Sequence, residues 1–585
     1  MRSFQKRLST LVFSLKLVYR ASPPLAAGLI SVLLLQGLLP AAGVWALGRL
    51  VDAVVTGTME QAALWGAVWV ALLFSDQALG PLSAYLQGNL NERLTAHLNR
   101  TLMQKINSFE DLTPFEYETF YNRVQLLREQ ASFQPTNLII FLSTSARDLF
   151  TAIPLLAVSA TLGWWVPLAL LVATAPYALV SLGLQRAIWE TVTGTNPEAR
   201  RMDYAASLLL NPQYAKEHRL FRTGDFWIAF YLENFRKLHR AMAARRREQL
   251  AKNLGTLALS LLGFAASVFG VLQRRPSAGQ VAMLLATLNQ LQQSLLLLAQ
   301  DGAMLLETLL YMDEVRSFLE EKPSLTASPG IRVKEAPPRI EFDNVHFSYP
   351  DGRKALSGVS FTLPPGELFG LVGENGAGKT TLVKLLLRFY EPSEGKILVD
   401  GKNLAELDLV AWRKHVAAIF QDYGRYALTL GENVALSDLE RKEDEDGVLR
   451  ALASAGGEEL VNKLPQGLST PLTKEFGGTE LSGGEWQKVA LARAFFRERA
   501  RVMVLDEPTA ALDPLAEVEL YKRFAELAQG RTTLLISHRL ASVRHAHRIL
   551  VLKEGRLIEE GDHEELLRKG GEYARMWEAQ RAWYR

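Results

Sequence analysis

The chain contains no cysteine among its 585 residues. Disulfide bonds, thiolate zinc sites and cysteine nucleophiles are therefore excluded together, and the redox compartment cannot be inferred. Histidine is scarce, with nine residues, and none has a spacing such as His-Glu-x-x-His that would predict a structural metal. Charges of the two signs are nearly balanced: 65 Lys and Arg and 62 Asp and Glu give a formal net charge of +3. This balance argues against a dedicated nucleic-acid binder.

Charge is also missing from several long stretches before about residue 300. Residues 21–48 carry none, and at about 1.5 Å per residue a helix of this length crosses a hydrocarbon core of about 30 Å. Six such spans are expected. They cover about 21–48, 61–84, 140–162, 164–186, 252–273 and 277–300. The sequence therefore predicts an all-α transmembrane domain with cytoplasmic extensions over residues 1–320.

Basic residues predict how this domain lies in the membrane. The segment 186–252 is rich in Lys and Arg, whereas the loops between spans one and two and between spans three and four are short and poor in them. Positive charge favours the cytoplasmic side, so both termini are expected there, with Arg274 and Arg275 as an exception. Residues 1–20 combine basic and apolar residues at helical spacing, which predicts an amphipathic helix on the cytoplasmic surface or an ordinary surface helix. We expect a multi-pass protein of the cytoplasmic (inner) cell membrane.

Three charged residues lie within the expected spans: Asp76, Arg147 and Asp148. An unpaired Asp or Arg at mid-bilayer costs about 2.5–3.5 kcal/mol on translocon scales, so these side chains should be paired or face water. We hypothesise an intramembrane ion pair between Asp76 and Arg147, with a position at the cytoplasmic interface as the alternative. The sixth span also carries amides that favour either a wet cavity or hydrogen bonds between helices. They are Asn289, Gln290, Gln292, Gln293 and Gln300.

The second half of the chain has a different pattern. Residues 321–338 are rich in proline and charge without periodicity, which is typical of a linker. Apolar residues then alternate from Ile340, and the runs Leu368–Val372, Val502–Leu505 and Leu534–Ile536 are typical of buried strands separated by helices. Residues 339–585 are therefore expected to form an α/β domain.

The segment Glu367–Thr381, ELFGLVGENGAGKTT, contains the phosphate-binding pattern G-x-x-x-x-G-K-[ST]. Its glycine-rich turn lets backbone N–H groups converge on a polyphosphate, and the following helix adds partial positive charge at its N-terminus. Lys379 is expected to reach the β- and γ-phosphates, and Thr380 to offer a hydroxyl to Mg²⁺; the alternative is a glycine turn without a ligand. The expected phosphate-binding residues are Gly373, Asn375, Gly376, Ala377, Gly378, Lys379, Thr380 and Thr381.

A second nucleotide element is RVMVLDEP, residues 501–508. Asp506 ends an apolar strand and is expected to hold Mg²⁺ through water, and Glu507 is expected to orient or deprotonate an attacking water. Two acids after an apolar strand are common by themselves. When they follow a phosphate loop, as here, they indicate a site of nucleotide hydrolysis.

Between these elements lies LSGGEWQK, residues 481–488. With the motifs on either side, this segment resembles the ATP-binding cassette (ABC) family, and the whole chain looks like an exporter-type half-transporter. In that family the signature segment of one subunit closes on ATP held by the phosphate loop of the other. The resemblance implies that Ser482, Gly483 and Gly484 contact ATP in this way, while Glu485 stands where the family usually has Gln.

The resemblance implies roles for four further residues. Tyr349 matches the aromatic residue that stacks on adenine, although a lone Tyr there would also suit the core. Gln421 matches the loop glutamine that meets Mg²⁺, Asp513 the loop that crosses the dimer interface, and His538 the switch histidine that contacts the γ-phosphate. The catalytic residues would then be Glu507 and His538, and the metal ligands Thr380, Gln421 and Asp506.

In the same family, cytoplasmic helices dock on the nucleotide-binding domains. The best candidates are Phe109–Arg123 and Asn211–Phe221, which mix aromatic and charged residues, although a solvated loop helix would look similar. These segments and the signature look most like the lantibiotic and peptide-exporter branch.

The resemblance predicts an ATPase that uses ATP and Mg²⁺ to export or flip an amphipathic substrate, a drug, a peptide or a lipid, by alternating access. ATP sites between paired domains imply a second copy of the chain, or a homologous half-transporter, as partner. Membrane lipids would surround the pair, and no nucleic acid is involved. The alternatives are a lipid or lipid-linked glycan flippase and, from another class, an ATP-gated channel or sensor module.

Overall fold

The protein is described by a computed structural model over residues 2–173, 176, 180, 197–325, 330–508 and 528–583. It divides into two compact units. Unit 1 comprises Met1–Ile106 and Arg123–Glu321, and unit 2 comprises Asn107–Asn122 and Lys322–Arg585. The expected order, a helical membrane region followed by an α/β domain, is confirmed, but unit 2 also takes a short segment from the first half of the chain.

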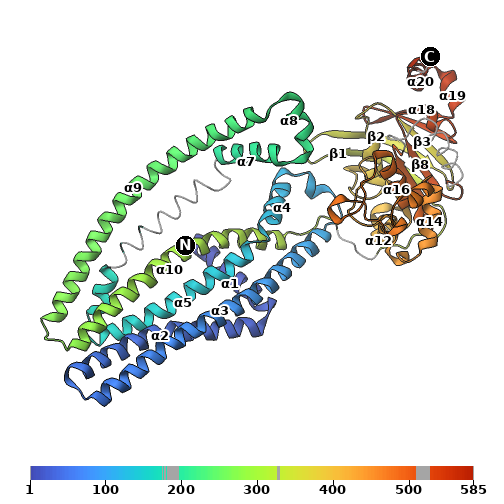
Figure 1. The fold of residues 1–585 in the computed structure, drawn as a ribbon. Helices are drawn as coiled ribbons and strands as arrows, with labels where there is room; N and C mark the ends of the chain where they lie inside the picture. The colour runs from blue at the N-terminus through green and yellow to red at the C-terminus, as the bar shows by residue number, and fades with distance from the viewer. Residues whose placement is uncertain are drawn as a thin grey trace. The chain divides into compact units, whose positions relative to one another are not determined.

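Unit 1 consists of long helices (Figure 1). Their bounds are α1 Arg2–Ala21, α2 Pro23–Thr56, α3 Met59–Asn107, α4 Glu118–Gln130, α5 Gln134–Ala160, α7 Pro197–Leu210, α8 Ala215–Phe221, α9 Gly224–Leu272 and α10 Ala278–Glu320. Among the described residues, five helices (α2, α3, α5, α9 and α10) are long and apolar enough to cross a membrane. They correspond to the first, second, third, fifth and sixth expected spans. Of the expected fourth span, only residues 164–173, 176 and 180 lie within the described residues.

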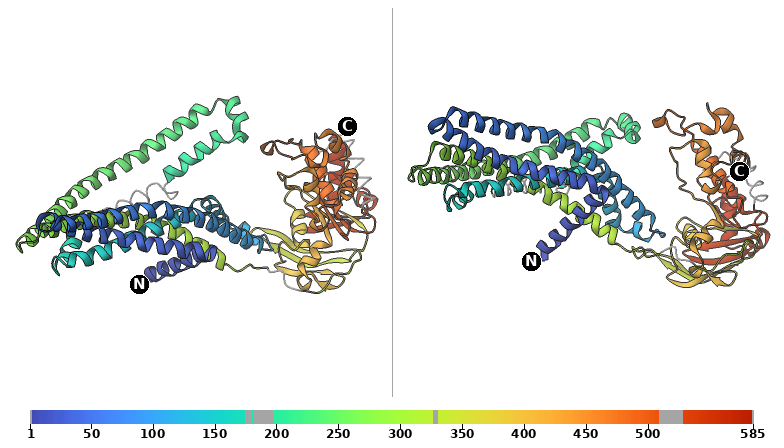
Figure 2. Two further views of the ribbon diagram at one scale, coloured as in Figure 1. Left: turned by 60° about the horizontal axis from the view of Figure 1, so that its bottom comes forward. Right: turned by 90° about the horizontal axis from the view of Figure 1, so that it is seen from below.

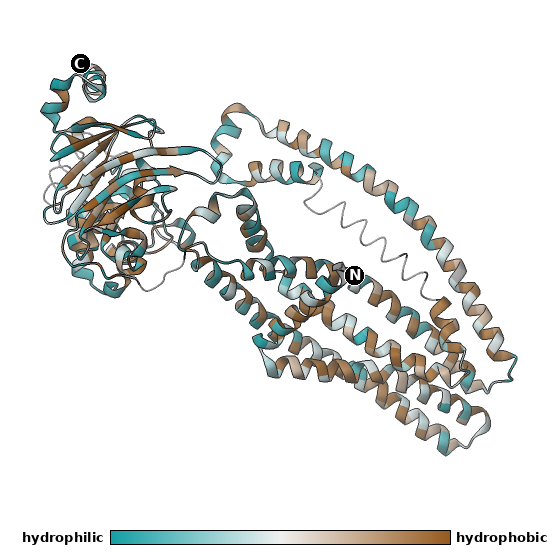
Figure 3. Cartoon of the chain, turned by 180° about the vertical axis from the view of Figure 1, so that it is seen from behind, coloured by the Kyte–Doolittle hydropathy of each residue, from teal (hydrophilic) through white to brown (hydrophobic). Residues whose placement is uncertain are grey.

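Several of these helices extend well past the membrane-crossing length. The helices α3 and α9 have 49 residues each and α10 has 43. At about 1.5 Å per residue, α3 is about 70 Å long, more than twice the hydrocarbon thickness. Hydropathy locates only the apolar part of such a helix, so the predicted spans are shorter than the helices. Figure 3 illustrates the difference along α9, where hydrophilic residues dominate the middle of the helix and hydrophobic ones the part toward α10.

Helices α2, α5 and α10 pack closely, because α2 has glycines at the points where large side chains of α5 and α10 contact it. A Cβ atom added to Gly37 of α2 would lie 2.3 Å from Cβ of Phe150 on α5, and one added to Gly48 would lie 2.3 Å from Cγ of Met283 on α10. Small residues therefore let these backbones approach each other. By contrast, the most apolar stretch of α3 has none of its residues buried within the chain. Figure 2 also shows α7, α8 and the first part of α9 diverging from the packed helices.

The charged residues within the spans do not pair as hypothesised. The Arg147 guanidinium lies 3.3 Å from Asp148 Oδ1, and within the described parts of the chain no ion pair joins it to Asp76. The Asp76–Arg147 hypothesis is therefore wrong in this structure. The physical reason is burial, because Asp148 is 3% exposed and needs a cationic partner more than the exposed Asp76 does. Asp76 instead lines a cavity of about 240 Å³ together with Asn289 and Gln290 of α10.

Helix α1 is bound to the end of α10 on one side. Lys6 Nζ lies 2.7 Å from Asp313 Oδ2, and Thr10 Oγ1 donates to Asp313 Oδ1 at 2.9 Å. The opposite stripe consists of exposed apolar residues: Leu8, Val12, Leu15 and Tyr19. An apolar stripe of this kind is what a helix at a membrane surface presents, and the interfacial position of α1 stays a prediction.

Unit 2 contains two sheets. Their strands are β1 Ile340–Ser348, β2 Lys354–Leu363, β3 Leu368–Val372, β4 Glu394–Val399, β5 Lys402–Asn403, β6 Val416–Ile419, β7 Val502–Asp506, β8 Thr532–Ile536, β9 Arg548–Lys553 and β10 Arg556–Gly561. One sheet is antiparallel with the order β2-β1-β4-β5, and the other has the order β10-β9-β3-β8-β7-β6. In the second sheet the pairs from β9 to β6 are parallel, which confirms the expected α/β layout. The carboxyl ends of β3, β7 and β8 therefore meet at one edge, where ligands of such sheets bind.

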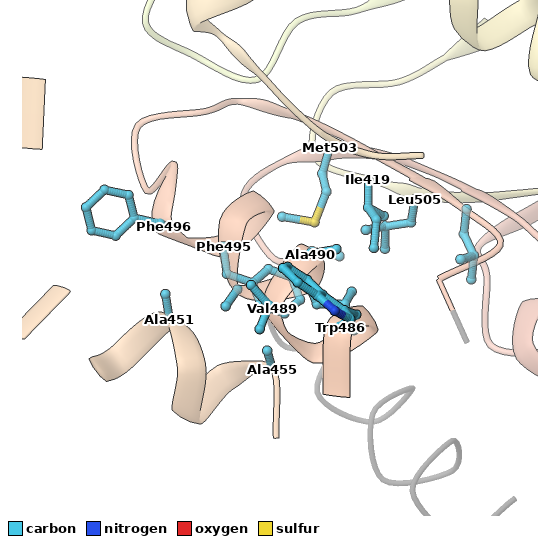
Figure 4. Close-up of a cluster of buried hydrophobic side chains, with 14 of the residues drawn as sticks. Ile419, Ala451, Ala455, Trp486, Val489, Ala490, Phe495, Phe496, Met503 and Leu505 are labelled. Carbon is cyan, nitrogen blue, oxygen red and sulfur yellow. The ribbon is translucent and has the colours of Figure 1, made fainter. Parts of the chain in front are cut away.

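The described helices of unit 2 pack against the strands or against one another. They are α11 Lys379–Leu386, α12 Leu409–Lys414, α13 Leu430–Ala435, α14 Glu445–Ser454, α15 Glu458–Lys463, α16 Gly483–Phe496, α18 Leu540–Val543, α19 His563–Lys569 and α20 Glu572–Trp583. Figure 4 shows Trp486 and Val489 of α16 among the buried side chains around Met503 of β7, with Ala451 of α14 on the other side. This core fixes the signature helix α16 to the strand that ends in Asp506.

Candidate nucleotide-binding site

The phosphate loop connects β3 to α11. All five residues of β3 are buried, which fixes the start of the loop in the sheet. Gly373, Gly376 and Gly378 then adopt φ angles of 154°, 82° and 104°. A Cβ atom at Gly373 would lie 2.1 Å from the carbonyl oxygen of Leu552, so only glycine fits there. The loop thus curls over the N-terminus of α11, in the geometry that binds phosphate.

Lys379 lies at the centre of this loop. Its ammonium group donates to the carbonyl oxygens of Gly373 and Glu374 at 2.8 and 2.9 Å. The residue is 6% exposed, and burial lowers the pKa of its ammonium group. The loop therefore holds a cation where the β- and γ-phosphates were expected.

Thr380 and Asp506 come together although 126 positions separate them in the sequence. Thr380 Oγ1 donates to Asp506 Oδ2 at 3.2 Å. Asp506 is 2% exposed at the end of β7, and burial raises the pKa of its carboxyl to about 6. A hydroxyl and a buried carboxyl are oxygen groups of the type that Mg²⁺ prefers.

Glu507 joins the other two polar residues predicted for hydrolysis. Gln421 Nε2 donates to Glu507 Oε2 at 2.9 Å, and His538 Nδ1 lies 3.3 Å from Glu507 Oε1. The backbone of Glu507 has a φ of 50°, in the left-handed region, and its N–H donates to Ile536 of β8 at 3.0 Å. Such a conformation costs about 1–3 kcal/mol in a residue other than glycine and is found at functional sites. The carboxylate is thus held among three loops that follow β6, β7 and β8.

Tyr349 occupies a more crowded position than expected. It is 8% exposed, and its Oη lies 3.0 Å from Thr381 Oγ1. The guanidinium carbon of Arg353 lies 4.7 Å from the centre of the ring, where a cation interacts with the π electrons. Sequence reasoning missed Arg353, although its place four residues after the tyrosine in a turn brings it back over the ring. Stacking of Tyr349 on adenine stays a prediction. It requires the Arg353 side chain to move off the ring or to contact one face while adenine contacts the other.

The signature segment begins helix α16. Ser482 is the N-cap residue, and Ser482 and Glu485 form a capping box in which each side chain bonds to the other's backbone N–H. Lys463 forms an ion pair with the Glu485 carboxylate. Hydrogen bonding from Lys463 and from the Ser482 backbone lowers the pKa of Glu485 to about 2. Glu485 therefore suits its position, since a carboxylate is favoured at a helix N-terminus.

The structure thus brings six of the predicted residues together at the edge of the parallel sheet, in a polar network of two linked groups, Thr380 with Asp506 and Gln421 with Glu507 and His538, beside the charge of Lys379. Ser482, Gly483 and Gly484 start a different helix, and Asp513 lies outside the described residues.

Comparison with known proteins identifies this arrangement. The sequence profile of the family described as ABC transporter matches residues 356–510. The chain is also similar to a solved bacterial Atm1-family ABC exporter with ATP bound, with a TM-score of 0.79 and 25% identity over 95% of this chain and 98% of that one. The chain is an ABC exporter half-transporter. Its ABC domain binds ATP, and its ATPase activity is coupled to transport.

Two curated relatives match the exporter over nearly its whole length, and a third matches it over more than half. The subtilin transport ATP-binding protein SpaT of Bacillus subtilis is 27% identical, over 97% of this chain and 93% of its own length. The nisin transport ATP-binding protein NisT of Lactococcus lactis subsp. lactis is also 27% identical, over 98% of this chain and 97% of its own. Human ATP-binding cassette sub-family B member 6 is 35% identical over 57% of this chain and 39% of its own length.

The first predicted docking segment of the exporter lies against its nucleotide-binding domain, within unit 2. Arg413 donates to the Glu110 carboxylate at 2.7 Å and also to the Glu110 carbonyl oxygen at 2.7 Å. The Leu112 N–H donates to the carbonyl oxygen of Phe389 at 3.0 Å, and Tyr390 donates to Glu116. The residues that receive this segment, Phe389 and Tyr390, lie three and four positions after the end of the phosphate-loop helix α11, so a short stretch of chain links the contact to the ATP site. The second predicted segment, Asn211–Phe221, belongs to unit 1, where Leu220 and Phe221 are 75% and 67% exposed.

Replacing Glu110 should weaken this docking. In Glu110→Ala, the half-buried Arg413 keeps only carbonyl partners, and loss of a charge-assisted hydrogen bond costs about 1.5–3 kcal/mol. We expect the stimulation of ATP turnover by substrate to fall about tenfold, while turnover without substrate changes less than about twofold. Glu118→Ala, which removes an exposed carboxylate from the same segment, is the matched control. Equal stimulation in the two variants would contradict the role of Glu110.

Proposed function

We propose that this exporter moves a cationic amphipathic peptide across the cytoplasmic membrane by alternating access, as a homodimer that hydrolyses ATP at two sites. The observation that carries the peptide proposal is similarity to the subtilin and nisin transport proteins over 97% and 98% of the chain. Drugs and lipids are the other amphipathic substrates that the fold can accommodate. The long apolar helices and the bacterial relatives support placement in the cell membrane.

Three features support a second copy as partner. The most apolar stretch of α3 is unburied within the chain. The segment α7–α9 diverges from the packed helices (Figure 2). It carries the exposed apolar residues Leu210, Leu220 and Phe221, which fit a docking surface for a nucleotide-binding domain of the partner. The six hydrolytic positions that form the polar network in this chain favour two working sites, and hence a homodimer, over a pair with a homologous half-transporter.

The polar network fits Mg-ATP. Thr380, Asp506 and Gln421 would hold Mg²⁺, because a hydroxyl, a buried carboxylate and an amide oxygen are hard ligands. When bound, the metal would neutralise phosphate charge. Lys379 would exchange its carbonyl partners for phosphate oxygens, and the Glu507 carboxylate would accept a proton from water. His538 is 3.3 Å from that carboxylate and would turn to donate to the γ-phosphate.

The cavity beside Asp76 supports a cationic substrate. Trp69 and Asp76 of α3 and Asn289 and Gln290 of α10 line its 240 Å³. Asp76 is its one charged lining residue among the described parts of the chain. A carboxylate with two amides and an indole suits an ammonium or guanidinium group on an amphipathic chain.

Neutralising this carboxylate should lower the response to a cationic peptide. In Asp76→Asn we expect the peptide concentration for half-maximal stimulation of ATPase to rise about tenfold, which is about 1.4 kcal/mol. Turnover without peptide should stay within about twofold. Glu60→Gln removes a charge from the exposed start of the same helix and serves as the control. A response equal to the parent protein's would exclude Asp76 from peptide binding.

The proposed function itself is tested with the purified full chain in lipid nanodiscs. ATP turnover and particle mass should be measured in the nanodiscs, and peptide uptake should be measured in proteoliposomes. Each measurement should use a cationic amphipathic peptide and a matched peptide whose lysines are replaced by glutamine. A dimer that hydrolyses ATP and transports the cationic peptide supports the proposal. Lipid flipping without peptide transport would identify a flippase instead, and a folded dimer without turnover would point to a second, homologous chain.

A further inference from the structure

The C-terminal helix α20 reaches back to the loop that carries His538. Residues 572–583 lie beyond the 356–510 that match the family profile. The amide of Gln580 on α20 makes two hydrogen bonds with the loop after β8. Its Oε1 accepts from the N–H of Leu540 at 2.9 Å, and its Nε2 donates to the carbonyl oxygen of His538.

Gln580 thereby holds the backbone on either side of Arg539. The loop also has internal supports, since Ser537 Oγ accepts from the Arg539 N–H at 3.0 Å, and the hydroxyl and backbone N–H of Ser542 donate to the Arg539 carbonyl oxygen at 2.5 and 3.1 Å. The His538 side chain is 48% exposed and reaches Glu507 at 3.3 Å. Because a side chain that is half in solvent has few contacts of its own, the direction of the imidazole depends on its backbone.

Helix α20 is itself fixed to the domain. The Glu559 carboxylate of β10 accepts from the N–H groups of Glu572 and Tyr573 at 2.5 and 3.1 Å, which caps the helix. Tyr573 is fully buried and its Oη lies 2.8 Å from His563 Nδ1, while the Trp577 ring lies 4.6 Å from the His563 ring. Gln580 therefore projects from a rigid element.

We infer that Gln580 is a positioning residue for ATP hydrolysis, which acts by holding the His538 loop. The role needs a donor and an acceptor on one planar group, and among side chains only Gln and Asn offer both as an amide. Asn is one methylene shorter and would not reach both partners. The C-terminal helix is thus part of the hydrolytic machinery, although Gln580 touches neither nucleotide nor metal.

The test compares three variants of the full chain in nanodiscs. Gln580→Ala removes both hydrogen bonds, Gln580→Glu keeps the acceptor for Leu540 but places a carboxylate against the His538 carbonyl, and Arg581→Ala changes an exposed neighbour on the same helix. We expect kcat to fall about tenfold in both Gln580 variants, with KM for ATP and the unfolding temperature close to those of the parent. Arg581→Ala should behave as the parent. A positioning role lowers kcat at constant KM because it acts on the transition state.

A double variant separates a role through His538 from a general loss of structure. If Gln580 acts through the imidazole, adding Gln580→Ala to His538→Ala should change phosphate release, followed over long incubations, by less than about twofold. An unchanged kcat in Gln580→Ala overturns the inference. A fall in kcat that comes with a lower unfolding temperature also overturns it. The same holds if Gln580→Ala lowers phosphate release by the same factor in the His538→Ala background as in the parent protein. These readouts use ATP hydrolysis alone, so they stand whether or not the substrate is a peptide.

Discussion

The variant Glu507→Gln should bind ATP with nearly unchanged affinity and turn it over at least about 100-fold more slowly. The reason is chemical, because an amide cannot accept the proton of an attacking water, and general-base catalysis contributes about 10²–10⁴-fold to rate. The shape of the site should persist. A Gln side chain has the size of Glu and still offers an oxygen to Gln421, whose Nε2 now lies 2.9 Å from Glu507.

The measurement is phosphate release together with nucleotide retention after gel filtration. Glu554→Gln is a demanding control, because Glu554 also has a φ in the left-handed region, 48° against 50° for Glu507, but lies exposed in a turn between β9 and β10. Loss of turnover in both variants would point to a general sensitivity of the domain to losing a carboxylate and not to a specific role of Glu507. Substantial turnover in Glu507→Gln alone would remove Glu507 as the base.

The variant Lys379→Met should lose ATP binding. The Lys379 ammonium is held by two carbonyl oxygens of the phosphate loop at 2.8 and 2.9 Å, so its removal takes away both the charge that meets the phosphates and a cross-link within the loop. A hydrogen bond to a charged group is worth about 1.5–3 kcal/mol, which predicts a loss of affinity of at least about tenfold.

The loss should be read by titration calorimetry and by the shift in unfolding temperature that ATP produces. Lys402→Met removes a lysine from an exposed strand of the same unit and should leave both readings unchanged. Normal ATP affinity in Lys379→Met would contradict the assignment of the phosphate loop. Together the two site variants separate binding from chemistry, since one should lose affinity and the other turnover.

Periodicity and motif order were sufficient to predict the strands that build the site. The run Leu368–Val372 is the strand β3 residue for residue, and the run Val502–Leu505 falls one residue short of β7. These strands are buried on both faces, so their sequences are continuously apolar and easy to recognise. The absence of charge located the membrane helices for a similar reason, since only an apolar surface is stable in lipid.

The contacts between distant residues could not be predicted in this way. Periodicity identifies a buried face but not its neighbour, so the pairing of Arg147 with Asp148, the cation of Arg353 over Tyr349 and the bonds from Gln580 to the His538 loop emerged only from the structure. The ends of the long helices were missed because α3 and α9 continue for many residues beyond the apolar part that hydropathy detects.

The discontinuity of unit 2 has a consequence for how the protein is made. Its segment Asn107–Asn122 leaves the ribosome before Lys322, from which the rest of the unit is built. At about 5–20 residues per second, the intervening 199 residues, Arg123–Glu321, take about 10–40 s to synthesise. During that interval Glu110 and Leu112 have no Arg413 or Phe389 to bind. The docking segment is therefore without its partners in unit 2 while α5, α9 and α10 enter the membrane. Assembly of the ABC domain with its docking segment is one of the last steps in the maturation of each chain.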